Sequence, residues 1–183
     1  MAQFEEVYAG LAVAREVCRD EAQMIATELD RLNSLGGESL WPFCMGGFSV
    51  LGQELLTIGG VPENPEIIYL ARLATELAAA PFFEQRSNMS FNRYDPFSGG
   101  ITHEDDDFSS PVFVVGMTDV DDDSFEYYHK TGEGPMVDQL ADSPKTLRLE
   151  AGDVLKITDT TLSHRGINPA SKFRYSAVFF SGL

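Results

Sequence analysis

A succession of short strand-like segments fills the second half of the chain and restricts its possible folds more than any other feature. Between residues 88 and 181, short runs of β-branched and aromatic residues alternate with turns rich in glycine, aspartate and serine. We expect strands at residues 89–94, 100–105, 112–117, 125–129, 146–150, 153–158, 163–168 and 174–180. Strands this short and this numerous predict a mainly β fold, a sandwich or jelly roll, braced by helices on one face.

The first half of the chain has a helical pattern instead. Apolar residues recur at three- and four-residue steps and predict one long amphipathic helix over residues 3–35, ended by the glycine pair that begins at Gly36. A second helix is expected over residues 65–80, with Pro65 at its first position. Residues 40–60 are apolar and glycine-rich, which predicts a loop with a short strand.

Length and composition favour one domain. At 183 residues with 43% hydrophobic residues, the chain can bury a substantial core. We expect a single domain over residues 1–183, with helical support over about 1–85 and a β core over about 86–183. No apolar run is long enough for a membrane span, and the first residues do not resemble a secretory signal. Cys18 and Cys44 are expected to be reduced thiols, so the expected location is cytoplasmic.

The net charge of −16 limits the possible partners. A strongly acidic surface repels phosphate backbones and anionic lipids, so we expect neither a nucleic-acid nor a membrane partner. Simple solubility and adaptation to a salty environment are alternative reasons for such a surface. An anionic cosubstrate would require a locally positive pocket, which Arg174 could supply.

Two short segments contain the residue types of a metal site. His103 and Asp105 are two residues apart, so in a strand their side chains share one face while Glu104 points to the other. His164 follows about sixty residues later, an order that suits the two-histidine, one-carboxylate face that binds Fe(II) and leaves coordination positions open. The alternatives are an acidic loop with an incidental histidine and a hydrogen-bonded core histidine. His129 has no carboxylate two residues on and is expected to be an ordinary surface or strand residue.

The last strand carries a cation among apolar neighbours. Arg174 and Ser176 share one strand face with apolar residues, and a buried guanidinium needs a partner because an unpaired buried charge is costly. A carboxylate is its bidentate match, supplied either by a ligand or by one of the chain's own acidic residues. Asn92 and Tyr94 share a face of an earlier strand and could bind the same ligand or serve as framework.

Taken together, these segments resemble the non-haem Fe(II)- and 2-oxoglutarate-dependent oxygenase superfamily. The resembling segments are Asn92-Arg93-Tyr94, His103-Glu104-Asp105, Leu149-Glu-Ala-Gly-Asp153-Val-Leu, Ser163-His-Arg-Gly and Arg174-Tyr-Ser-Ala-Val-Phe-Phe180. They cover about residues 88–181, roughly half of the chain. The fold that the resemblance implies is a double-stranded β-helix of the jelly-roll or cupin-like kind.

The resemblance also implies a metal site and a cosubstrate site. Fe(II) would be bound by His103, Asp105 and His164. The distal carboxylate of 2-oxoglutarate would be bound by Arg174, with Ser176, Tyr94 and Asn92 around it. With dioxygen as the other cosubstrate, the implied enzyme is a dioxygenase that hydroxylates or otherwise oxidises a small-molecule metabolite and releases succinate and CO2.

Three other functions remain open at the level of sequence. A non-redox isomerase or lyase could use the same ion as a Lewis acid. The Asn92-Arg93-Tyr94 segment resembles the AlkB-like nucleic-acid branch, and a protein-modifying oxygenase would use the same ligands. A metal-free binding protein could keep the fold alone. Metal content separates the last from the others, and succinate release separates the oxygenases from the isomerase or lyase.

Overall fold

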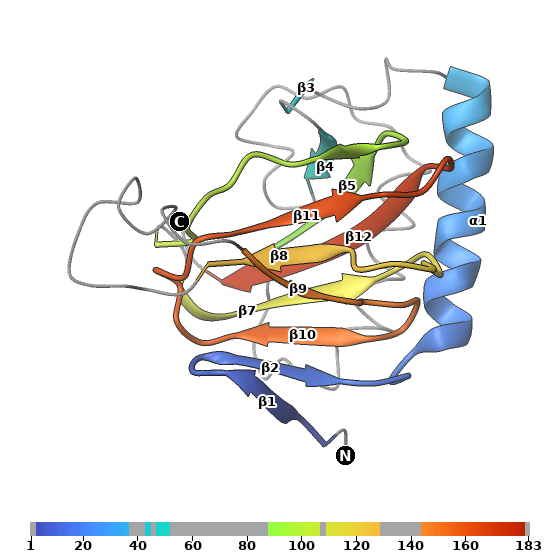
Figure 1. Ribbon diagram of the computed structural model, residues 1–183. Helices are drawn as coiled ribbons and strands as arrows, with labels where there is room; N and C mark the ends of the chain where they lie inside the picture. Colours follow the sequence, from blue (N-terminus) through green and yellow to red (C-terminus); the bar gives the residue numbers. More distant parts are fainter. Residues whose placement is uncertain are drawn as a thin grey trace.

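The structure is a computed structural model that describes residues 3–36, 43–44, 47–51, 88–106, 109–128 and 144–181. These residues form two antiparallel sheets and one helix (Figure 1). The larger sheet has the order β1 (Glu5–Tyr8), β2 (Leu11–Ala14), β10 (Val154–Ile157), β7 (Ser109–Gly116), β12 (Arg174–Ser181), β5 (Asn88–Tyr94), β4 (Gly47–Leu51) and β3 (Phe43–Cys44). The smaller sheet has the order β6 (Ser98–Gly99), β11 (His164–Asn168), β8 (Phe125–Tyr127) and β9 (Lys145–Leu147). The expected mainly β class is therefore confirmed.

The larger sheet buries a different set of side chains on each face, because successive residues of a strand point to opposite sides. One face packs against α1 (Arg19–Gly36), which runs across the strands (Figure 1). This layer includes Phe91, Phe113, Val115, Tyr175, Ala177 and Phe179 from the sheet and Ala22, Ile25, Leu29 and Leu32 from the helix. The other face packs against the smaller sheet through Val112, Val114, Leu155 and Ile157, which meet Phe125 and Tyr127. The space between the two sheets is where the polar residues discussed below are found.

The predicted helix over residues 3–35 is wrong for its first part. Residues 5–14 form the β1–β2 hairpin, and α1 begins only at Arg19. The turn uses Gly10 at φ +80°, where an added Cβ would lie 2.6 Å from the Cβ of Asp159. Strand β2 then pairs with β10, so Leu11 and Val13 are buried between the sheets. The apolar positions of this segment fit a helix as well as a strand. Pairing with β10, about 140 residues later in the chain, selects the strand.

The predicted strand over residues 100–105 is also wrong as a regular strand. Strand β6 ends at Gly99, and beyond it the pairing with β11 is reduced to an isolated bridge between His103 and His164. The other strand predictions of this half are confirmed in position, although β8 and β9 are shorter than expected. Ala151 and Gly152 form a turn between β9 and β10, with Gly152 at φ +82°.

Several expectations fall on other parts of the chain. The predicted helix over 65–80 and the residue His129 lie outside the described residues. Strands β3 and β4 fall within residues 40–60, where a short strand was expected. In the described part of the chain, no helix combines the length and apolar character needed to cross a membrane.

Candidate metal centre

His164 is held between the two sheets at the start of β11. Its ring stacks on Phe125 of the neighbouring strand β8, with centroids 5.3 Å apart and an interplanar angle of 23°. Along β11 the residues alternate between buried and partly exposed, so His164 and Gly166 face the interior while Arg165 faces outward. The strand pattern in the sequence therefore fixes the direction of the His164 side chain.

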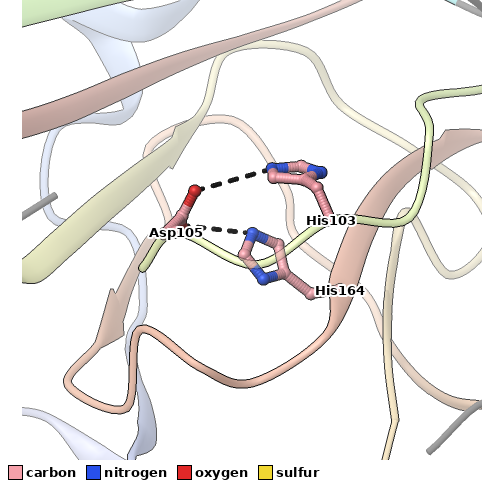
Figure 2. A group of neighbouring side chains, drawn as sticks. All are labelled: His103, Asp105 and His164. Carbon is pink, nitrogen blue, oxygen red and sulfur yellow. Dashed lines mark ion pairs between the residues drawn. The ribbon is translucent and has the colours of Figure 1, made fainter. Parts of the chain in front are cut away.

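His103 and Asp105 come from the segment that crosses beside the start of β11. His103 is bridged to His164, and because opposed residues of an antiparallel pair project to the same side, the two rings lie 4.5 Å apart. Asp105 lies beside both rings: its Oδ1 is 3.6 Å from Nε2 of His103, and its Oδ2 is 3.4 Å from Nε2 of His164 (Figure 2). The structure thus brings together three side chains that are separated in sequence by up to 61 residues.

The ring orientations leave one nitrogen of each imidazole available. Nδ1 of His103 lies 2.9 Å from the carbonyl oxygen of Ile101, and Nδ1 of His164 lies 2.8 Å from that of Leu162. A carbonyl only accepts, so each Nδ1 carries the hydrogen and, in the neutral ring, each Nε2 keeps its lone pair. Both lone pairs then face the Asp105 carboxylate. Because all of these atoms are electron-rich, a cation placed among them would make the arrangement favourable. Such Nδ1 bonds are the usual means of orienting metal-binding imidazoles.

Burial favours the neutral ring at His164. The low-polarity surroundings lower the pKa of His164, while the Asp105 carboxylate acts in the opposite direction and His103 adds to the lowering. The donor atoms of the three residues all lie within 4.8 Å of one another. Two donors at about 2.1 Å from one ion, at a right angle, stand about 3 Å apart, which is close to the observed 3.4 and 3.6 Å. The residues therefore fit a transition-metal ion.

The three side chains of the cluster differ in exposure. The His103 side chain is 52% exposed, whereas those of Asp105 and His164 are 5% and 4% exposed. His103 is therefore the member of the cluster that meets solvent.

A second polar group lies on the same side of the larger sheet. Strands β5 and β12 pair Tyr94 with Arg174 and Asn92 with Ser176, so these four side chains share a face. The Arg174 guanidinium is 4.8 Å from the centre of the Tyr94 ring. Its Nε and Nη1 are buried without a hydrogen-bond partner among the described residues, and so is the Ser176 Oγ. Burial lowers the pKa of Arg174, and the Tyr94 side chain opposes this. Buried polar groups are normally hydrogen-bonded, so these unsatisfied atoms require an explanation.

Gly166 connects the two groups and was not singled out in the sequence. It lies two residues after His164 on the inward face of β11, and a Cβ there would lie 2.5 Å from Cζ of Tyr94. Only glycine lets the Tyr94 ring approach β11 this closely. The glycine in the Ser163-His-Arg-Gly segment was a visible signal, but its contact with Tyr94 depends on how the two sheets pack. Through Gly166, the strand that carries His164 packs directly on Tyr94, the neighbour of Arg174.

Comparisons with known proteins bear on the fold. No protein-family model matches the sequence, and no curated protein sequence matches it either. Among solved structures, the chain is similar to a prolyl-4-hydroxylase of Pseudomonas putida, with TM-score 0.59, 14% identity, and coverage of 95% of this chain and 93% of that one.

Two further structures share the fold. HygX from Streptomyces hygroscopicus, solved with nickel and 2-oxoglutarate bound, gives TM-score 0.60 at 17% identity and covers 94% of this chain and 82% of its own. SnoK, a non-haem α-ketoglutarate-dependent carbocyclase from nogalamycin biosynthesis, gives TM-score 0.55 at 13% identity, over 94% and 79%. The chain therefore has a fold found in solved Fe(II)- and 2-oxoglutarate-dependent oxygenases.

Proposed function

We propose that this chain is an Fe(II)- and 2-oxoglutarate-dependent dioxygenase that oxidises a small molecule and releases succinate and CO2. One observation carries the proposal: two imidazole Nε2 atoms and a carboxylate converge beside a buried arginine whose Nε and Nη1 have no hydrogen-bond partner among the described residues. The similarity of fold to HygX, solved with nickel and 2-oxoglutarate, supports it. We also propose that the two sheets form a double-stranded β-helix in a single domain.

In this proposal His103, Asp105 and His164 hold the ion. The carbonyls of Ile101 and Leu162 keep both Nδ1 atoms protonated and both Nε2 atoms available. Three protein ligands leave coordination positions open for the cosubstrate and dioxygen. When bound, Fe(II) would supply the redox chemistry that couples decarboxylation of 2-oxoglutarate to oxidation of a substrate C–H bond. Because Asp105 occupies one ligand position, we favour hydroxylation and related oxidations over halogenation.

Arg174 would bind the distal carboxylate of 2-oxoglutarate. Its planar guanidinium suits a bidentate carboxylate, and the buried Ser176 Oγ can donate a further hydrogen bond. The guanidinium lies over the Tyr94 ring, 4.8 Å from its centre, and Asn92 lies opposite Ser176 on the same face. Gly166 lies about 7 Å from His164 along β11 and packs closely on Tyr94, which supports a single site for both groups.

Charge and exposure support a small-molecule substrate. A net charge of −16 disfavours nucleic acid, and the half-exposed His103 is the part of the proposed metal site that meets solvent. The remaining ligands are buried, which keeps water away from them. HygX has been solved with hygromycin B bound, an example of a small-molecule ligand on this fold.

The first test is iron-dependent turnover of the purified chain. With Fe(II), 2-oxoglutarate and air, we expect succinate formation, stimulated by the correct member of a metabolite library. His103→Ala and His164→Ala should each abolish turnover and stoichiometric metal binding. His129→Ala removes the only other histidine of the sequence and serves as the control for metal binding. Bound metal without succinate release would instead support the isomerase or lyase, and turnover that survives both ligand changes would reject the ligand assignment.

A further inference from the structure

The segment that carries His103 and Asp105 is out of regular register with β11. Strand β6 pairs Gly99 with Ile167, and the N–H of Gly100 donates to the carbonyl of Gly166. The next pairing is the bridge between His103 and His164. Three residue steps from Gly100 to His103 thus oppose two steps from Gly166 to His164, which is the signature of a β-bulge. The bulge turns residues 103–105 so that two donors face His164.

Few backbone bonds hold this segment after the bulge. His103 and His164 exchange N–H···O=C bonds of 3.0 and 2.9 Å, and the N–H of Asp105 donates to Thr160 at 2.7 Å. Backbone bonds do not distinguish one residue type from another. A slip by one residue could therefore re-form such bonds while turning His103 and Asp105 to the opposite face. Something specific to side chains is needed to fix the register.

Glu104 and Ser163 meet this need. Because His103 opposes His164 in an antiparallel bridge, Glu104 opposes Ser163, and both point to the reverse side from the metal donors. The Ser163 Oγ–H donates to Oε1 of Glu104 at 3.0 Å, and Ser163 is fully buried. A hydrogen bond to a carboxylate is stronger than one between neutral groups. This contact forms in the observed register only.

We propose that Glu104 and Ser163 are a positioning pair, which locks the register of residues 101–106 against β11 and thereby sets the metal affinity of the site. The inference rests on the proposed function, since it concerns the same metal centre. Neither residue belongs to the proposed ligand set; both would act through the backbone that carries His103, Asp105 and His164. Losing the pair leaves all three ligands in the sequence but removes the contact that holds them in convergence.

The experiment measures binding of Co²⁺ alone to the full chain, from its visible absorption during anaerobic titration. We expect Glu104→Ala and Ser163→Ala each to raise the dissociation constant by about tenfold or more, as changes behind metal ligands usually do. The double variant should bind no more weakly than the weaker of the two single variants, because both changes remove the hydrogen bond between Ser163 and Glu104. Glu104→Gln keeps an oxygen acceptor for Ser163 and should restore most of the affinity.

A matched control comes from the same strand. Glu126→Ala removes the 2.6 Å ion pair between Glu126 and Arg165, which ties β11 to β8 rather than to residues 101–106, and should leave Co²⁺ affinity unchanged. Unchanged affinity in Glu104→Ala, additive losses in the double variant, or an equal loss in Glu126→Ala would each overturn the positioning pair. If the unmodified chain does not bind Co²⁺, the metal centre itself is refuted, so the two failures are distinguishable.

Discussion

At the scale of single residues, Arg174 combines a cost to stability with a proposed use in binding. Its guanidinium is fully buried, and neither Nε nor Nη1 has a hydrogen-bond partner among the described residues. Burying a charge without a full set of partners is unfavourable for folding. A carboxylate ligand would supply the missing acceptors. The same residue should therefore lower the stability of the free protein and raise its affinity for 2-oxoglutarate.

Arg174→Met tests both effects at once. The free energy of unfolding of the metal-free protein should rise by about 1 kcal/mol or more, since a hydrophobic side chain of similar length replaces a poorly satisfied charge. The KM for 2-oxoglutarate should rise sharply, because the bidentate partner is lost. Urea unfolding and succinate assays give the two quantities. A variant that is destabilised, or that affects only the KM of the prime substrate, would contradict this role.

Gly166→Ala should impair the same pocket from the opposite sheet. Its Cβ would lie 2.5 Å from Cζ of Tyr94, so the ring must move away from Arg174. We expect a weaker affinity for 2-oxoglutarate and a destabilisation of about 2 kcal/mol, typical of overpacking. Gly99→Ala is the control, because its Cβ would lie no closer than 3.2 Å to Cγ2 of Ile167 and 3.4 Å to the carbonyl oxygen of Gly166, and should cost less. Equal effects of the two substitutions on 2-oxoglutarate binding would refute the proposed contact.

At the scale of elements, the junction between β2 and α1 determines how the N-terminal part docks. The carbonyl of Gly152 accepts from the N–H of Val17 at 2.8 Å, and a Cβ at Gly152 would lie 2.4 Å from the backbone of Arg19. The buried Asp153 binds Arg15 at 2.6 Å and the N–H of Glu16 at 3.0 Å. The turn between β9 and β10 thus fits into the start of the helix.

Cys18 reports on whether this junction is closed. Burial raises the pKa of its thiol to about 11 from 9.0, with smaller contributions from Glu21 and Asp153. At pH 8 the thiolate is therefore about a hundredfold scarcer than in an exposed cysteine. In a Cys44→Ser background, we expect alkylation by iodoacetamide to be slow in the folded protein and fast in urea, measured by mass spectrometry. Fast alkylation of the native protein would show that the junction is open.

The pairing of distant strands explains why some elements could be predicted from the sequence and others could not. Strands β5, β7, β10, β11 and β12 were expected because their alternation survives in any sheet that covers one face. The β1–β2 hairpin was missed because its apolar spacing also fits a helix, and its partner β10 lies far along the chain. The regular strand expected at 100–105 was wrong because one extra residue forms a bulge before His103. A local sequence pattern does not show which distant strands pair or where the register shifts.

At the scale of the whole molecule, the sequence predicted which residues make up the candidate site, but it did not predict what surrounds them. His103, Asp105 and His164 could be chosen from the pattern because few residue types bind metals. Their convergence depends on how two sheets pack, as does the contact of Gly166 with Tyr94. The carbonyls that orient the imidazoles belong to Ile101 and Leu162, and their identity carries no sequence signal.

Metal binding should also appear in the stability of the whole chain. A ligand that binds only the folded state adds about 2.7 kcal/mol when present at a hundred times its dissociation constant. The net charge of −16 attracts any divalent cation to the surface, whereas nitrogen donors select Ni²⁺ over Mg²⁺. We expect thermal unfolding of the metal-free protein to shift upward with Ni²⁺ and to change little with Mg²⁺ at equal ionic strength. The Ni²⁺ shift should be absent in Asp105→Ala.

The Ni²⁺ shift should depend on pH with a defined sign. Burial lowers the pKa of His164 below its ordinary value of 6.5. Below pH 6.5 the unfolded chain therefore binds a proton that the folded protein does not, and the free energy of unfolding falls. Protons also compete with the metal for Nε2. Calorimetry at pH 8 and pH 5.5 should therefore give a large Ni²⁺ increment at the higher pH and a small one at the lower. Equal increments would place the ion on surface carboxylates, because those donors remain ionised at both values.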